Sequence, residues 1–209
     1  MKDIPVFATE LGVASLTLSE IPVWKRAYIK IQSTASVDAF VEECTAFCRM
    51  AGAEQIYVSG HESLQAFPLH AVIVQMRCSR EALPDTDAAL FPVQQSTLSD
   101  FVRIYNEKAA RIPNAAYLTT AQARQMQDGY FVHRDGKLLG IGRASGDTIG
   151  FLASVSPGAG PDVLAALAHA ITTDVVKLEV ATANKKALAL YDRMGFVTTR
   201  EISRWYCVK

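Results

Sequence analysis

Hydrophobic and polar positions along the chain follow two rhythms, one typical of strands and one typical of helices. In residues 37–51, "VDAFVEECTAFCRMA", hydrophobic residues recur every three or four positions, which predicts a helix capped by Ser36. The apolar segments on either side predict buried strands. The elements expected in the first half are a strand at 23–32, this helix, a strand at 53–60, a brief helix at 61–66 and a strand at 69–78.

The second half begins with helices and continues with a run of strands. Asp135-Gly136 separates two alternating apolar runs, a pattern typical of a β-hairpin, so we expect residues 129–156 to form an antiparallel meander. Pro161 suits the first turn of a helix. The elements expected here are helices at 98–112 and 121–127, the meander, a helix at 161–171, a strand at 176–180, a helix at 184–194 and a strand at 201–208.

The two halves repeat one order of elements. Residues 37–78 and 161–208 both run helix, strand, short helix, strand, although their sequence identity is poor. A duplication and the common alternation of helices and strands both explain this order. The segment 79–96, with two prolines and several acidic residues, predicts a connector. We therefore expect an α/β (α+β) protein with a smaller N-terminal unit at 1–95 and a second domain at 96–209.

Composition narrows the function classes. The chain has 209 residues, half of them hydrophobic, and no apolar run approaches the ~20 residues that span a bilayer. Lys and Arg number 21, as do Asp and Glu; the acidic excess lies in 1–95 and the basic excess in 96–209. No basic cluster is dense enough for nucleic acid. The four cysteines and four histidines lack ligand spacing, so we predict buried thiols, a cytoplasmic protein and no metal.

Residues 181–196, "ATANKKALALYDRMGF", have the features of a well-formed helix. Asn184 suits the N-cap, Gly195 suits the C-cap, and an apolar stripe includes Leu188 and Tyr191. Stability alone explains these features, except that a leucine would serve as well as Tyr191 in a buried stripe.

The longer segment "LEVATANKKALALYDRMGF" (178–196) resembles the C-terminal signature of the GNAT (Gcn5-related N-acetyltransferase) superfamily. The resemblance rests on apolar-Glu-Val at a strand end, followed by Asn, Ala, Leu-Tyr and Gly-Phe. The order of elements from 97 to 208 also follows that family. The resemblance implies a mixed central sheet flanked by helices and the transfer of an acetyl group from acetyl-CoA to an amine. It reaches residues 1–95 only through the repeated order of elements, as a degenerate copy.

The resemblance also implies roles for particular residues. Tyr191 would be the general acid that protonates the departing thiolate, and Glu179 would deprotonate the attacking ammonium through water. Each has a plainer explanation: Tyr191 as a packing residue, and Glu179 as an exposed residue paired with a lysine. The residues expected to contact acetyl-CoA are Ala153, Val155, Gly158, Ala159, Gly160, Asn184 and Tyr191.

The expected phosphate loop, "VSPGAGPDVLAAL", departs from the family pattern. It has Gly158-Ala159-Gly160 but no preceding Arg or Gln, and Pro161 removes one amide donor. Asp162 places a carboxylate in the first helical turn, where it would repel a pyrophosphate.

Three hypotheses remain open: an active acetyltransferase, an inactive GNAT-fold binding or regulatory module, and an unrelated α/β protein. The expected partner is a small-molecule or peptide amine, with Tyr105, Asn106, Arg111 and Tyr117 as candidate lining residues. A homodimer is left open. Residues 1–95 could cover the cleft, mediate dimerisation or form the degenerate copy.

Overall fold

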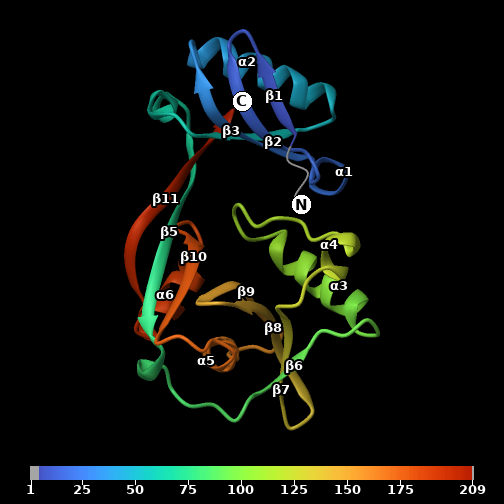
Figure 1. Cartoon of the computed structure of the whole chain (residues 1–209), viewed down its shortest axis with the longest axis vertical. Coiled ribbons are helices and arrows are strands. Elements are labelled where there is room, and N and C mark those ends of the chain that lie inside the picture. Colours follow the sequence, from blue (N-terminus) through green and yellow to red (C-terminus); the bar gives the residue numbers. More distant parts are fainter. Residues whose placement is uncertain (1–4, 209) are drawn as a thin grey trace. The chain divides into compact units, whose positions relative to one another are not determined.

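The computed structural model describes residues 5–208, and the chain divides into two compact units (Figure 1). Unit 1 comprises the residues up to Val72 together with those from Ile202 onward, and unit 2 comprises Ile73–Glu201. This division differs from the expected boundary at residues 95 and 96. Strand β5 (Leu69–Ser79) begins in unit 1 and ends in unit 2, and β11 (Val197–Val208) runs from unit 2 back into unit 1.

Unit 1 contains an antiparallel meander, a helix and a parallel strand. The meander β1–β2–β3 leads into α2, and β4 then pairs in parallel with β3. The elements of unit 1 besides β5 and β11 are β1 (Val6–Thr9), β2 (Gly12–Thr17), α1 (Ile21–Trp24), β3 (Arg26–Thr34), α2 (Val37–Met50), β4 (Gln55–Ser59) and the 3-10 helix η1 (Glu62–Ala66).

Unit 2 repeats this order and precedes it with two helices and an edge strand. The meander β7–β8–β9 leads into α5, and β10 pairs in parallel with β9. The elements of unit 2 besides β5 and β11 are the 3-10 helix η2 (Arg80–Ala82), β6 (Ala89–Pro92), α3 (Leu98–Ala109), α4 (Thr120–Arg124), β7 (Gly129–Arg134), β8 (Lys137–Ser145), β9 (Thr148–Ser154), α5 (Gly160–His169), β10 (Val175–Ala181) and α6 (Lys185–Arg193).

The two repeats exchange their last strands. β5 follows the parallel strand β4 of the first repeat in sequence, yet it pairs antiparallel with β10 of the second repeat through seven register pairs. In the same way β11 ends the second repeat but pairs with β4 through Tyr206, Cys207 and Val208. Each unit is therefore completed by a strand from the other half of the sequence.

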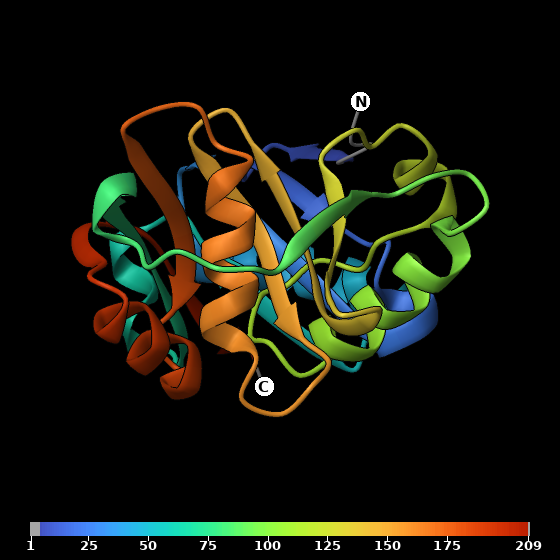
Figure 2. The same ribbon diagram turned by 90° about the horizontal axis from the view of Figure 1, so that it is seen from below.

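Helices cover both faces of the unit 2 sheet. Figure 2 shows α5 crossing the strands β8 and β9. On that face a Cβ on Gly142 would lie 2.2 Å from Leu167, so glycines on β8 let the helix approach closely. On the opposite face α3 packs through aromatic rings, with Tyr105 4.0 Å from Phe151 between ring centroids. The mixed sheet flanked by helices confirms the expected fold class.

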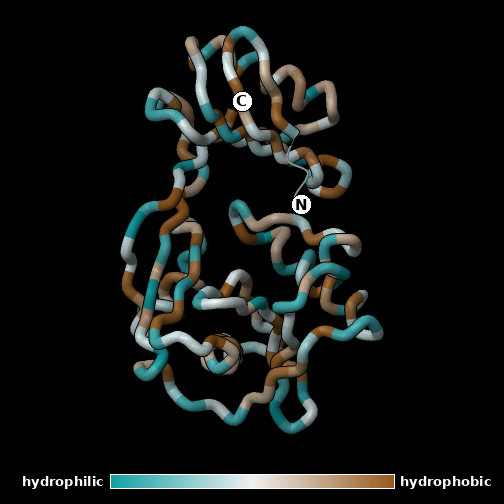
Figure 3. Tube along the Cα trace, in the orientation of Figure 1, coloured by the Kyte–Doolittle hydropathy of each residue, from teal (hydrophilic) through white to brown (hydrophobic). Residues whose placement is uncertain are grey.

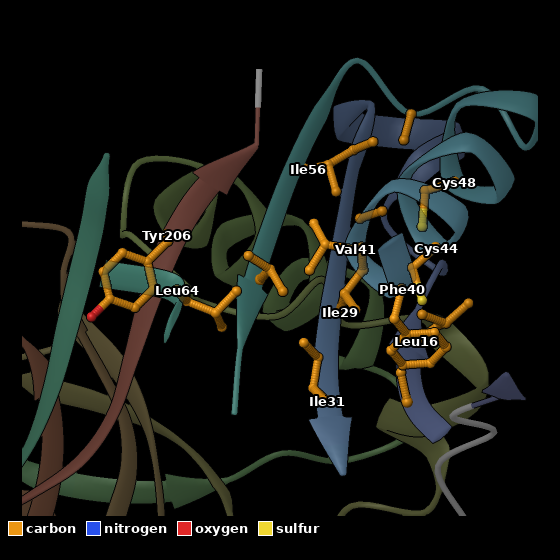
Figure 4. Packing of buried hydrophobic residues seen from close by; sticks show 14 of the residues in the cluster. Leu16, Ile29, Ile31, Phe40, Val41, Cys44, Cys48, Ile56, Leu64 and Tyr206 are labelled. Atoms are coloured by element: carbon orange, nitrogen blue, oxygen red, sulfur yellow. The ribbon is translucent and has the colours of Figure 1, made fainter. Parts of the chain in front are cut away.

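The core of unit 1 lies between α2 and the strands β2, β3 and β4 (Figure 4). Phe40, Cys44 and Cys48 on α2 face Leu16 and Ile29, and all are fully buried. Burial raises the pKa of Cys44 to about 12 and that of Cys48 to about 11. Cys78 is buried as well, so three of the four thiols are in the core, as expected, and Cys207 is half-buried. Figure 3 shows hydrophobic and hydrophilic stretches alternating along the chain.

Three local expectations were incomplete. The first residues of the predicted strand 23–32 belong to a single helical turn, α1, which begins at Ile21 and ends where Lys25 adopts a left-handed conformation (φ 57°), so β3 starts only at Arg26. Strands β1 and β2 were missed, and the connector 79–96 contains β6. The Asp135-Gly136 hairpin is confirmed, with positive φ at both residues.

Candidate functional site

The parallel strands β9 and β10 separate shortly after they begin. Their register pairs Thr148 with Lys177 and Ile149 with Leu178, and within the described residues the ladder extends no further. Both strands nevertheless continue, β9 to Ser154 and β10 to Ala181. The carboxyl-terminal parts of the two strands therefore border an opening in the middle of the sheet, which we call the slot.

A β-bulge explains where the slot begins. In the antiparallel ladder with β8, Arg143 pairs with Phe151 and Ala144 with Ile149, so Gly150 is the extra residue. A bulge bends its strand and increases the local twist. Because the bulge follows directly after Ile149, the last β9 residue paired with β10, it turns β9 away from β10.

The corresponding strands of unit 1 remain closed. β3 and β4 pair at five successive positions, from Arg26 with Gln55 to Lys30 with Ser59, which is the whole length of β4. The next residue, Gly60, packs so closely that a Cβ there would lie 2.3 Å from the Ile31 carbonyl oxygen. The bulge of β3, at Gln32, comes only after this paired stretch. Unit 1 therefore has no slot between these strands.

The backbone groups that face the slot belong to Leu152 and Ser154. The N–H of Val155 donates to the Leu139 carbonyl at 2.8 Å, so the polar groups of Val155 point to β8. A Cβ on Gly140 would lie 2.5 Å from the Ala153 oxygen, which places that carbonyl on the β8 side too. Alternate residues of a strand point their polar groups to opposite sides. The backbone groups of Ala153 and Val155, from which contacts were expected, therefore point to β8 and not to the slot.

The loop after β9 leads into an uncapped helix start. Gly158 has a left-handed φ of 78°, Ala159 is the N-cap of α5, and Gly160 is the first helical residue. Ala159 offers no side-chain oxygen, so the first amides of α5 lack the partner that a serine or asparagine would supply. A Cβ on Gly160 would lie 3.1 Å from Leu190, so this loop lies beside α6.

Asp162, in the first turn of α5, is neutralised by an arginine. Its carboxylate is 2.6 Å from the Arg134 guanidinium and also accepts a hydrogen bond from Thr86 at 3.3 Å. Arg134 forms a second ion pair with Asp87. The hydrogen bonds that Arg134 donates to these carboxylates, that to Asp162 foremost, raise the pKa of Arg134. The repulsion expected from Asp162 is therefore weakened by a cation that sequence reasoning missed, because Arg134 ends β7, 28 residues away.

Helix α6 carries two of the predicted residues. The Asn184 side-chain oxygen accepts from the Ala187 amide at 3.3 Å, which confirms the predicted N-cap. Tyr191 is buried and packs against Phe196, with ring centroids 5.9 Å apart. Its hydroxyl has no hydrogen-bond partner among the described residues. Burial raises the pKa of Tyr191 to about 12, so the phenol stays protonated across the physiological range.

Glu179 is the first β10 residue beyond the ladder with β9, and it is exposed. Leu178 is buried, so Glu179 projects from the other face of the strand. The lysine that could have paired with it, Lys177, is instead 2.6 Å from Asp147. That lysine holds the pKa of Asp147 below its ordinary value. In the described part of the chain the Glu179 carboxylate has no ion pair, so pairing with a lysine does not account for it.

Other candidates have structural contacts or lie elsewhere. The Asn106 side chain bonds both the N–H and the carbonyl of Leu118 at 2.9 Å, which fastens α3 to the segment before α4. A cavity of about 540 Å³ at the β6 edge is lined by Phe91, Phe131 and His133 among others and includes none of the predicted site residues.

Among residues 5–208 no helix could span a membrane, and no group of three acidic, His or Cys side chains could hold a metal.

No protein-family model matches the chain, and no curated protein matches it. Solved structures, in contrast, do match the chain. A functionally unknown conserved protein from Staphylococcus epidermidis has a TM-score of 0.61 at 12% identity, covering 99% of this chain and 94% of that one. A GCN5-related N-acetyltransferase from Sphaerobacter thermophilus has a TM-score of 0.56 at 12% identity, covering 94% and 76%. A tandem GNAT protein from the clavulanic acid biosynthesis pathway has a TM-score of 0.55 at 11% identity, covering 94% and 78%.

These neighbours define the fold as that of the GNAT acetyltransferases. The match to a tandem GNAT protein extends over nearly the whole chain, so residues of both units take part in it. This agrees with the repeated order of a meander, a helix and a parallel strand in the two units. The identities of 11–12% establish the architecture alone.

Proposed function

We propose that the protein is an acetyl-CoA-dependent N-acetyltransferase with a single active site, in unit 2. The observation that carries this proposal is the slot, because β9 and β10 form only two register pairs and then separate at the Gly150 bulge. An extended thioester arm can pair with the backbone of a separated strand as another strand would. Unit 1, in which β3 and β4 stay paired over the whole of β4, offers no such place.

The residues around the slot suit the co-substrate. Leu152 and Ser154 present backbone groups to an extended amide-containing arm. The loop 155–159 and the uncapped start of α5 suit a pyrophosphate, since free amides and the helix dipole favour an anion there. The Arg134 ion pair offsets the charge of Asp162 at this position. Acetyl-CoA supplies an activated acetyl group as its thioester.

The chemistry assigned to the chain's own residues consists of proton movements at Glu179 and Tyr191. Glu179 takes a proton, through water, from the ammonium of the acceptor, which releases the nucleophilic amine. Carbon–nitrogen bond formation and carbon–sulfur bond cleavage then leave a thiolate. Tyr191 donates its phenolic proton to that sulfur, a role for which its raised pKa keeps it protonated. The second proton, which the nitrogen loses as the amide forms, passes through water to the phenolate and restores the Tyr191 phenol. Asn184 positions α6, because its side chain caps the helix that carries Tyr191.

Calorimetric titration with acetyl-CoA and then with CoA tests the proposal. We expect binding of both with one molecule per chain, because only unit 2 has a slot. A stoichiometry of two would contradict the assignment to unit 2. Binding without CoA release on exposure to amines would favour the alternative, an inactive GNAT-fold binding module, and absence of binding at high micromolar concentration would overturn the proposal.

A further inference from the structure

The exchanged strand β5 brings residues of the N-terminal repeat next to Glu179. The antiparallel register pairs Gln75 with Glu179 and Arg77 with Lys177. Directly opposed residues of an antiparallel pair share a face, with their Cβ atoms about 5 Å apart. Gln75 is therefore the direct cross-strand neighbour of the proposed base, although 104 positions separate the two residues in sequence.

Gln75 has a fixed backbone and an uncommitted side chain. Its carbonyl oxygen accepts a hydrogen bond from the Thr199 hydroxyl at 3.2 Å, which ties β5 to β11 at this point. The carboxamide is half-buried and has no hydrogen-bond partner within residues 5–208. Around it Lys177 is committed to Asp147. The Gln75 carboxamide and the Glu179 carboxylate are thus two free polar groups side by side, at the point where the slot begins.

The two groups match the hydrogen-bonding pattern of a primary ammonium. An ammonium has three N–H donors, and a carboxylate can accept one of them while a neighbouring carboxamide oxygen accepts another. A carboxamide is neutral and does not titrate, so it binds the cation without competing for the proton that Glu179 is to take. A second carboxylate in place of the carboxamide would bind the ammonium more strongly. The ammonium would then hold its own proton more tightly, and Glu179 would remove that proton less readily.

We infer that the carboxamide oxygen of Gln75 binds the acceptor ammonium beside Glu179. This inference rests on the proposed function. It assigns the N-terminal repeat a direct part in the active site: the repeat has no slot of its own but supplies one wall of the amine site of unit 2 through β5. The preferred substrates are accordingly primary amines: a primary ammonium can donate to both groups and keep a third N–H for water, whereas a secondary ammonium has only two N–H groups and a tertiary one cannot bind both side chains.

Steady-state kinetics of the full-length Gln75→Leu and Gln75→Glu variants test the inference, with ethylamine as the acceptor and release of the CoA thiol as the readout. For Gln75→Leu we expect the KM for ethylamine to rise about tenfold or more, because a hydrogen bond to a charged group is lost. The KM for acetyl-CoA should change less than twofold. For Gln75→Glu we expect the KM for ethylamine to be at or below the wild-type value, and kcat to fall.

Gln95→Leu is the matched control, the same change at an exposed position outside the strands of unit 2. Ethylamine KM values that are equal in wild type and Gln75→Leu would overturn the inference, as would equal losses in Gln75→Leu and Gln75→Glu, which indicate damage to the strand. Acetyl-CoA binding without acetylation of ethylamine by the wild type would overturn it too. Failure to bind acetyl-CoA would instead overturn the proposed function itself.

Discussion

Tyr191 combines two properties that a packing residue would not need. Its ring is buried against Phe196, which a leucine or phenylalanine would achieve as well, yet its hydroxyl has no partner within the described range of the chain. Because desolvation raises the pKa of Tyr191 to about 12, the same burial keeps the phenol in its proton-donating form. Burial of the ring at this position therefore favours acid chemistry.

Replacing Tyr191 with phenylalanine should therefore lower kcat about 100-fold, a typical contribution of a general acid. The acetyl-CoA dissociation constant should stay within a factor of two, because the ring packing is kept. In the wild type, ionisation of the phenol should reduce kcat only as the pH approaches 12, since a raised pKa favours the protonated form. Kinetics and calorimetry on Tyr191→Phe separate the effect on turnover from the effect on binding. Tyr206→Phe, the same change at a buried tyrosine of unit 1, is the control. Equal losses of turnover and binding in Tyr191→Phe would contradict the acid role.

The charge at the start of α5 depends on an ion pair between a residue of α5 and a residue of β7. Asp162 suits the helix dipole but is a poor neighbour for a phosphate, and Arg134 at the end of β7 neutralises it at 2.6 Å. Both side chains are about one-third exposed, so solvent screens their charges in part. The arrangement makes the affinity of α5 for an anion depend on a residue from another element.

The variant Arg134→Gln should consequently weaken acetyl-CoA binding about five- to tenfold by leaving Asp162 unpaired. Asp162→Asn should bind at least as tightly as the wild type, and the double variant should recover most of the loss. Titration calorimetry at low and high salt measures these effects, which salt should reduce. Lys177→Gln, which breaks an ion pair outside this loop, is the control. An Arg134→Gln loss that persists in the Asp162→Asn background would contradict the charge explanation.

Elements with a local cause were predictable, and contacts between distant segments were not. The helices α2, α5 and α6 follow from apolar stripes, with Asn184 capping α6, although Ser36 makes no side-chain cap on α2. The Asp135-Gly136 hairpin follows from its turn residues. Strands β1 and β2 were missed, and they join through Glu10 and Leu11, a turn without glycine or asparagine. The bulge at Gly150 and the Arg134 pair depend on strand register and tertiary contact. Tyr191 and Glu179 were reached only through resemblance to a family.

At the scale of the whole chain, the exchanged strands explain why the unit boundary was not predictable. By their positions in the sequence, β5 belongs to the first repeat and β11 to the second. The hydrogen-bonding partners of each strand, however, belong to the other repeat. The exchanged strands also connect the N-terminal repeat, which has no slot, to the second repeat, which has one. The N-terminal repeat then contributes to the proposed site through β5 and cannot be removed without removing the neighbour of Glu179.

A cut in the connector should therefore leave the two halves bound together. A protease recognition sequence placed between Pro84 and Asp85, both exposed, would allow the folded protein to be divided there. Seven β5–β10 register pairs and three β11–β4 pairs would still join the fragments. We expect the fragments to co-elute in size-exclusion chromatography, to separate only in denaturant, and to bind acetyl-CoA within about threefold of the uncut insertion variant, a small free-energy change. Separation in native buffer would show that each half keeps its own last strand, and it would remove Gln75 from the proposed amine site.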